Sequence, residues 1–218
     1  MKHLTIALCA SSFLFIACNN NGEKTETVKT DSTTTEVKKT DEAWVPIDSA
    51  TMMKAMMDYG TPGKMHELLA SWNGTWTGET TMWDYEGAPP QKSTSTEVNS
   101  MILGGKYQTS KHTGDMMGMP FEGISTTAYD NATKQFVATW IDTWSTGIMT
   151  MTGNWDEATK TLTLTGKTPD ICRPGKECTM RQVITVVDDN THNMVMYGPD
   201  SKTGKEYKVM ELKMTRKK

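Results

Sequence analysis

The segment KQFVATWIDTWSTGIMTMTGNWDEATKTLTLTG, residues 134–166, decides the fold of this protein. Apolar residues recur at every second position in its first and third parts, with Phe136, Ala138 and Trp140 on one face and Leu162 and Leu164 on another. A period of two is typical of strands that bury one face. The linkers DTWSTG and DEATK are short and leave no room for a helix, so the segment predicts three consecutive antiparallel strands.

The same pattern runs from Trp76 to the end of the chain, interrupted by short linkers rich in Gly, Asp, Asn and Pro. A meander of about ten strands removes its edges most simply by closing into a barrel. We therefore expect a mainly β protein with a single antiparallel up-and-down barrel. Side chains nearly fill the interior of such a barrel, or it holds one small ligand. The expected strands cover approximately residues 74–83, 94–102, 105–113, 121–129, 134–142, 147–155, 160–166, 178–188, 191–197 and 206–216.

Two helices are expected before the barrel. In residues 48–60, Asp48 or Ser49 is the expected N-cap and Gly60 the stop signal. One apolar face of this helix consists of methionines, and we expect them to be core residues: Met52, Met53, Met56 and Met57.

The second helix is expected within residues 61–74. Thr61 is the expected N-cap, Pro62 occupies the first helical position, and Asn73-Gly74 ends the helix. Its apolar side consists of Met65, Leu68, Leu69 and Trp72.

The N-terminus has the features of an export signal. An apolar run from Leu4 to Ala17 follows Lys2 and His3 and is too short to cross a bilayer as a mature helix. The run ends in LFIAC, which resembles a bacterial lipobox, whose cysteine is acylated and becomes the first mature residue. We expect a signal peptide over 1–17, an acylated Cys18 with a disordered tether over 18–43, and a folded part over 44–218.

Lipid on Cys18 makes the membrane the expected partner, and we expect the protein on the outer membrane of a Gram-negative bacterium. The net charge of −3 and the pI near 5.8 argue against nucleic acid as a partner. No protein partner can be named from the sequence.

Two cysteines fall within the expected barrel, Cys172 and Cys178. Pro174-Gly175 between them is a suitable pair for a type II turn, so flanking strands would bring the two sulfurs together. An even pair of this kind in an exported protein predicts a disulfide.

Two distant features resemble lipocalin-like (calycin) barrels. The tripeptide GTW, residues 74–76, opens the first strand after a short helix, and Arg216 lies at the end of the last strand. In those barrels the Trp closes the floor and the Arg packs over its ring. The resemblance implies that Trp76 and Arg216 close this barrel.

A second resemblance covers about residues 62–216. The motifs GGKY (104–107), GMPFEG (118–123), YDN (129–131) and WID (140–142), the last followed by Thr146-Gly147, resemble those of DUF1579, a family of bacterial exported proteins of unknown function. Ala128 and Thr143 depart from the Gly and Ser that are usual there. The resemblance implies a lipocalin-like barrel and no established activity. The candidate ligand-pocket residues are Tyr107, Met116, Met117, Phe121, Tyr129, Phe136, Trp140 and Asp142.

Catalytic signatures are not found. The run HELLA, residues 66–70, begins like a zinc protease motif but has Ala70 where the second histidine is required. The G-x-S-x-G, P-loop and G-x-G-x-x-G patterns are missing from the sequence. Asp142 is the best candidate for a functional acid, although such a carboxylate can instead bond the strand-end turn through Thr143 or Thr146. No catalytic residue is assigned.

The run HTGDMMGMPFEG, residues 112–123, combines one histidine and three methionines, which are soft-metal ligands. Methionine is also a flexible core filler, and Gly114-Asp115 and Gly118 mark a bend, so we expect an apolar hairpin tip over the barrel mouth. The histidines at 66, 112 and 192 lie on a helix or at strand ends, which argues against a haem. We expect no metal and no cofactor.

Three functions remain. The favoured one is a lipoprotein that binds a small apolar or amphipathic ligand in its barrel. The alternatives are a structural or protein-interaction lipoprotein with a filled barrel, and an enzyme that acts on a barrel-bound small molecule through Asp142.

Overall fold

The computed structural model describes residues 44–218. The expected signal peptide, acylated Cys18 and tether lie outside these residues. Two helices, α1 (Ser49–Gly60) and α2 (Lys64–Ser71), precede the sheet. The strands follow in chain order as β1 (Gly74–Met82), β2 (Gln91–Ile102), β3 (Tyr107–Met116), β4 (Met119–Asp130), β5 (Gln135–Asp142), β6 (Met149–Asp156), β7 (Thr161–Pro169), β8 (Glu177–Asp188), β9 (Thr191–Pro199) and β10 (Glu206–Arg216).

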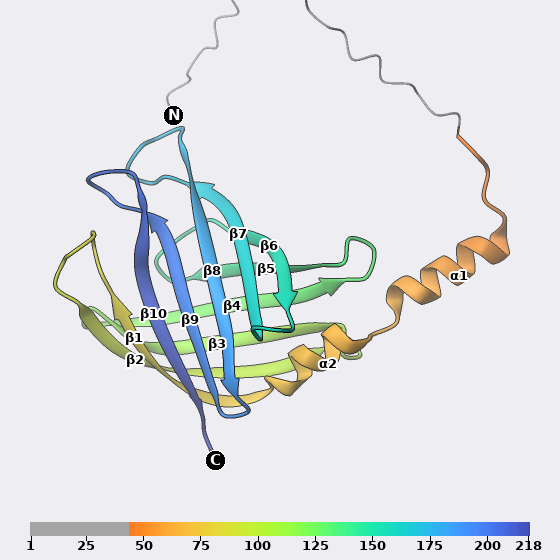
Figure 1. Ribbon diagram of the computed structural model, residues 1–218, viewed down its shortest axis with the longest axis horizontal. Helices are drawn as coiled ribbons and strands as arrows, with labels where there is room; N and C mark the ends of the chain where they lie inside the picture. The colour runs from red at the N-terminus through yellow and green to blue at the C-terminus, as the bar shows by residue number, and fades with distance from the viewer. Residues whose placement is uncertain (1–43) are drawn as a thin grey trace, which may run out of the picture. The chain divides into compact units, whose positions relative to one another are not determined.

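The ten strands form one closed antiparallel barrel (Figure 1). Each strand pairs with the next one in the chain, and β1 also pairs with β10 from Trp76↔Arg216 to Met82↔Met210. Neither β1 nor β10 is therefore left as an open edge. The predicted fold class is confirmed, and the predicted strand ranges agree with the observed ones to within a few residues.

The floor of the barrel lies where β1 begins and β10 ends. The indole of Trp76 is fully buried, and its Nε1 donates to the carbonyl of Trp72, 2.9 Å away. The guanidinium of Arg216 lies 4.2 Å from the centroid of that ring. It also donates to the carbonyls of Ser71 (2.8 Å), Asp189 (3.0 Å) and Asn73. One side chain thus joins the helix end, the β8–β9 turn and the first strand.

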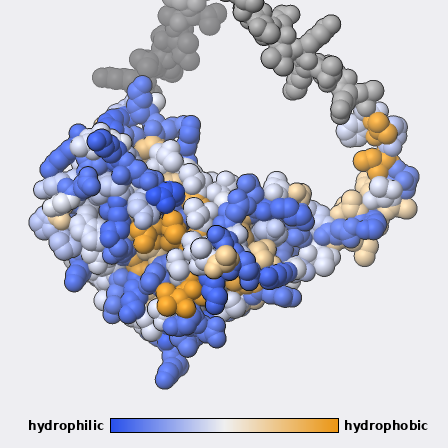
Figure 2. Space-filling model, viewed as in Figure 1, coloured by the Kyte–Doolittle hydropathy of each residue, from blue (hydrophilic) through white to orange (hydrophobic). Residues whose placement is uncertain are grey.

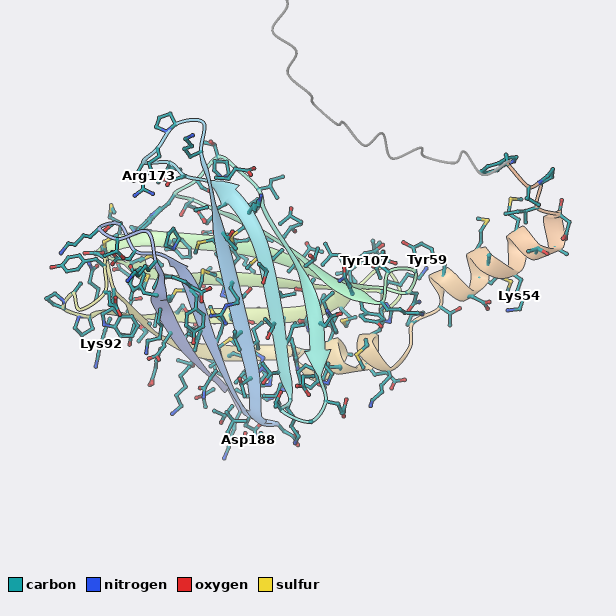
Figure 3. The ribbon with its side chains drawn as sticks, turned by 45° about the horizontal axis from the view of Figure 1, so that its top comes forward. Lys54, Tyr59, Lys92, Tyr107, Arg173 and Asp188 are labelled. Carbon is teal, nitrogen blue, oxygen red and sulfur yellow. The ribbon has the colours of Figure 1, made fainter. Side chains whose placement is uncertain are left out.

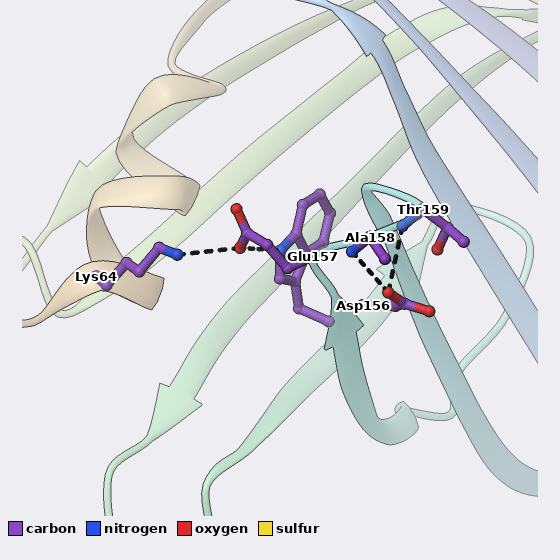
Figure 4. A network of polar contacts seen from close by, with 6 residues as sticks. Lys64, Asp156, Glu157, Ala158 and Thr159 are labelled. Atoms are coloured by element: carbon purple, nitrogen blue, oxygen red, sulfur yellow. Dashed lines mark hydrogen bonds and ion pairs between the residues drawn. The ribbon is translucent and has the colours of Figure 1, made fainter.

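Helix α2 covers one end of the barrel, which we call the α2 end. Leu69 and Trp72 are buried in a core cluster with Phe136, Leu162 and other side chains, and Met65 and Leu68 pack against that cluster, as the apolar pattern predicts. A polar contact on the surface adds to this packing, because Glu157 accepts from Lys64 (3.2 Å) and from the indole of Trp155 (3.0 Å) (Figure 4).

The start of α2 differs from the prediction. The helix begins at Lys64 with Gly63 as its N-cap, and Thr61 instead caps the C-terminus of α1. The side chain of His66 accepts a hydrogen bond from the Gly63 amide, 3.1 Å away, which stabilises the later start. Pro62 therefore lies in the link between the helices. The predicted N-cap of α1, Asp48, is confirmed, since its carboxylate accepts from the amides of Ala50 and Thr51.

The prediction that the methionines of α1 are core residues was wrong. No residue of this helix is buried, and the four methionine side chains are 53–66% exposed, a surface coloured pale orange along α1 in Figure 2. The physical reason is that the methionine face of α1 has no strand to pack on: α1 meets the barrel at its C-terminal end, where the Tyr59 carbonyl accepts from the side chain of Asn131 (3.0 Å), whereas α2 lies on β2, β3 and β4. Among the described residues, no helix is long and apolar enough to span a membrane.

We predict that burial of His192 makes the stability of the fold depend on pH. This imidazole is 3% exposed, and its ring centroid lies 4.4 Å from that of Trp76. Burial, with a smaller contribution from Arg216, lowers the pKa of His192 to about 4. The unfolded chain therefore takes up a proton before the folded one does, so the free energy of unfolding is greatest above pH ~6.5 and falls by up to about 3 kcal/mol towards pH ~4.

Urea denaturation of the wild type and of His192→Phe across this pH range measures the effect. The variant is expected to show a flatter profile between these two pH values. Equal slopes for the two proteins would contradict the assignment.

Candidate functional site

The interior of the barrel has two chemically different walls, which follow from the strand registers. Inward-facing positions of β2, β3 and β4 are mainly polar, and we call this surface the polar wall: Ser95, Glu97, Asn99, Gln108, Ser110, His112, Ser125 and Thr127. Inward-facing positions of β6 to β10 are mainly apolar and form the methionine wall: Met151, Leu162, Leu164, Ile184, Met194, Met196, Met210, Leu212 and Met214.

Several inward-facing side chains are only partly buried. Ser125 and Thr127 on the polar wall, and Ile184 and Met196 on the methionine wall, all belong to this group. Since these side chains point into a closed barrel, the surface they expose faces its lumen. The lumen is therefore not completely filled by the side chains of the protein.

A buried carboxylate lies at the centre of the polar wall. Glu97 is 6% exposed, and its cross-strand neighbours are Trp76 on β1 and His112 on β3. Its Oε1 accepts from the amide of Asn99 (2.6 Å), and its Oε2 lies 3.5 Å from Nδ1 of His112. Burial lowers the pKa of His112, although the nearby Glu97 carboxylate opposes this shift. Both side chains are largely buried, with 8% of the Glu97 and 16% of the His112 side chain exposed.

Other polar groups of this wall are used to hold α2. The amide of Gln108 donates to the carbonyl of Leu69 (2.5 Å), and that of Asn99 donates to the carbonyl of Trp72 (3.3 Å). These contacts add to the bonds that the Leu69 carbonyl accepts from the Trp72 amide and the Trp72 carbonyl accepts from the Trp76 indole, at a helix end where carbonyls lack their usual partners within the helix. The Oδ1 atom of Asn99 is buried without a partner, beside Glu97.

Two of the sequence motifs meet next to this pair. The indole of Trp140 from the WID motif lies over Gly123 from the GMPFEG motif, where an added Cβ would come within 2.3 Å of the ring. The same indole lies edge-on to His112, with centroids 5.0 Å apart, and stacks with Phe121. Gly123 is thus required because its missing side chain leaves space for Trp140.

Asp142 holds this arrangement in place. Its Oδ2 accepts from Nε1 of Trp140 (2.7 Å), and its Oδ1 accepts from the backbone amide of Trp144 (2.8 Å). Both oxygens are therefore engaged in orienting the indole and the strand-end turn. This geometry gives Asp142 a positioning role and offers no free carboxylate oxygen for an acid or base reaction.

The remaining pocket residues expected from the sequence do not form one group. Phe136 and Tyr129 lie at the α2 end, where their rings contact each other at 5.0 Å and Phe136 is fully buried. Met116 ends β3, and Met117 is 58% exposed at the hairpin tip. Tyr107 faces outward because its neighbour Gln108 faces inward, so its inclusion among the pocket residues was wrong (Figure 3).

The β3–β4 turn is shorter than predicted, because the bend was expected to include Gly114 and Asp115. Gly114 and Asp115 are strand residues that pair with Phe121 and Pro120, and the turn consists of Met117 and Gly118, both with positive φ. Two such residues form a tight primed turn, which extends both strands. His112 consequently lies well inside β3, so the statement that the histidines lie only on a helix or at strand ends was wrong.

The predicted disulfide is not present, and Cys172 and Cys178 are free. β7 ends at Pro169 and β8 begins at Glu177, so the cross-strand neighbour of Cys178 is Thr168. Cys172 instead lies exposed in the loop that carries Arg173 in Figure 3, where its amide donates to Asp170. Burial raises the pKa of the Cys178 thiol.

Sequence reasoning missed Glu97 and Asn99. A signal was nevertheless present, because Glu97 and Asn99 alternate with Val98 in a strand, which places the polar residues on one face and the apolar one on the other. The apolar face of a strand is usually expected to point inward, which would place Glu97 and Asn99 on the outside. In this strand the reverse holds, since Val98 is 47% exposed on the outer face. Among residues 44–218, no group of three or more His, Cys, Asp or Glu side chains could hold a metal ion.

Comparisons with known proteins agree with this geometry. The family model DUF1579, described as "Protein of unknown function", matches residues 61–216. Rv2717c from M. tuberculosis has a similar structure, with a TM-score of 0.54 and 12% identity, over 72% of this chain and 100% of that one. The S-type phycobiliprotein lyase CPES from Guillardia theta also has a similar structure, with a TM-score of 0.51 and 8% identity, over 75% of this chain and 97% of that one. Likenesses at such low identity show the fold alone. A comparison with curated proteins gives no significant match.

We predict that Gly123→Ala displaces the Trp140 indole, since the new methyl group would overlap the ring. The expected loss of stability is about 1–3 kcal/mol, with a changed near-UV circular dichroism spectrum. Gly147→Ala is the control, because nothing lies within 4 Å of an added Cβ there. Equal spectra and equal urea midpoints for both variants would refute the packing role.

Proposed function

This chain belongs to the DUF1579 family, which is described as of unknown function. From the structure of the barrel, we propose that the protein is an envelope lipoprotein that binds a small amphipathic molecule in its lumen. The observation that carries the proposal is the combination of two unlike walls with partly exposed inward side chains. Ligand sites of small proteins combine a mostly apolar lining with a few placed polar groups. The polar wall and the methionine wall provide these two elements.

Methionine suits such a lining. Its unbranched, polarisable side chain adapts to apolar molecules of different shape. Met194, Met196, Met210 and Met214 lie on adjacent strands β9 and β10, and the pairs Met196↔Met210 and His192↔Met214 place them in neighbouring registers. The apolar part of a ligand would lie along this wall.

The lipid anchor is the second part of the proposal. It rests on the LFIAC sequence at residues 14–18 and on the low-hydrophobicity segment that follows it. An acyl chain on Cys18, with the amphipathic ligand in the barrel, fits a protein that holds or passes on a poorly soluble molecule at the outer membrane of a Gram-negative bacterium.

We predict that the purified protein binds N-phenyl-1-naphthylamine, a neutral apolar dye whose fluorescence rises on leaving water. Ser125→Trp, which adds bulk to the lumen, is expected to weaken binding about tenfold or more. Ile124→Trp is the control, because Ile124 is 44% exposed on the outer face of the same strand.

Dye titration with each protein measures the two affinities. Equal affinity of both variants and the wild type, or no binding at all, would contradict ligand binding in the lumen. A filled barrel that acts through its surface would then be the better account.

The anchor gives a separate prediction. Cys18→Ser is expected to abolish incorporation of labelled palmitate and to release the protein from the membrane fraction of cells. Cys9→Ser, within the expected signal peptide, keeps both properties. Continued acylation of the Cys18→Ser protein would remove the anchor from the proposal.

A further inference from the structure

We propose that the polar wall selects ligands whose head group is a cation or a hydrogen-bond donor, such as a primary alkylamine, and disfavours carboxylates such as fatty acids. This proposal rests on the proposed function and specifies its ligand class. It follows from the charges that face the lumen and from the partners that each of them already has.

The lumen contains more negative than positive groups. Inward-facing positions of the described strands carry two carboxylates, Glu97 and Asp142, and one guanidinium, Arg216. The lysines in β1 to β10 do not change this balance, since the register places all five of them on the outer face: Lys92, Lys111, Lys167, Lys208 and Lys213. A fatty-acid head group would therefore meet like charge.

The one inward-facing guanidinium is already engaged. Arg216 lies on the ring of Trp76 and donates to three backbone carbonyls at the floor. Trp76 separates it from Glu97, because Trp76 pairs with Arg216 on one side and with Glu97 on the other. Arg216 has a structural role and offers little donor capacity to an anion in the lumen.

Of the two carboxylates, Glu97 has more acceptor capacity to spare. Both oxygens of Asp142 accept short hydrogen bonds from Trp140 and Trp144. A carboxylate has about four lone-pair sites. Glu97 uses one of them in a short bond from Asn99, and its other oxygen has only His112, at the long distance of 3.5 Å.

The surroundings of Glu97 add acceptors and no cation. Asn99 Oδ1 lacks a donor, and the adjoining strand β3 carries the hydroxyl group of Ser110, which can accept a hydrogen bond; Ser125 is the neighbour of Ser110 on the next strand, β4. Burial, opposed in part by the Glu97 carboxylate, lowers the pKa of His112 and so favours its neutral form. A buried carboxylate without a cationic partner is costly, and a cationic head group would supply that partner.

Displacement of N-phenyl-1-naphthylamine tests this selectivity. The competitors are dodecylamine, dodecanol and dodecanoate, which share one alkyl chain, used near neutral pH and below their micelle concentrations. At that pH the amine is protonated and the acid is ionised. Dodecylamine is expected to displace the dye at about tenfold lower concentration than dodecanoate, with dodecanol between them, since a hydrogen bond to a charged group gives about this factor.

The matched variants are Glu97→Gln and Glu79→Gln. Glu97→Gln removes the charge within nearly the same volume and is expected to bring the ratio of the two charged competitors close to one. Glu79 is exposed on the outer face of β1, so Glu79→Gln should keep the wild-type ratio.

Three results would overturn the proposal. The first is equal or better displacement by dodecanoate in the wild type, which decides the matter even if Glu97→Gln fails to fold. The second is a folded Glu97→Gln protein with the wild-type ratio. The third is a protein that binds no dye, which would refute the proposed function itself and the head-group selectivity with it.

Discussion

The pairing of β1 with β10 closes the barrel and determines which side chains face its lumen. It joins the first and last strands of the meander over the register from Trp76↔Arg216 to Met82↔Met210. Without it the sheet would have two open edges. Side chains would still alternate between its two faces, but neither face would enclose a lumen. The side chain of Arg216 stabilises this closure, because it contacts both the Trp76 ring and the carbonyls at the end of α2.

Closure also explains why polar side chains are buried in this protein. Once the register is fixed, every second residue of β2 and β3 faces inward, so Glu97, Asn99 and His112 enter the lumen together. Apolar residues of the same strands are turned to solvent, including Val98 at 47% exposure. Burying a polar group has a free-energy cost unless it is partnered, so a chain that places a carboxylate here gives up stability. We infer that this cost is connected with ligand recognition.

Much of the fold could be predicted from sequence because its signals are local. Alternating runs such as TLTLTG and the turn-forming linkers between them determine strands and their order, and an up-and-down meander adds few topological choices. The apolar side of α2, with Leu69 and Trp72, could be predicted from helical periodicity for the same reason.

What could not be predicted depends on contacts between distant residues. The methionines of α1 have the same pattern as a buried face, and only the absence of a packing partner leaves them exposed. The β3–β4 turn lies closer to β4 than predicted, because Met117 adopts a positive φ, which is rare for this residue type. Glu97 was missed since its alternation with Val98 does not say which face points inward; the register of the closed barrel decides that.

A crystal structure of the protein with dodecylamine would show where the head group and the alkyl chain bind. We expect the amine nitrogen to lie within hydrogen-bond distance of a Glu97 carboxylate oxygen, with the alkyl chain along the methionine wall. A ligand bound only on the outer surface, or a lumen whose side chains leave no density for it, would contradict the account.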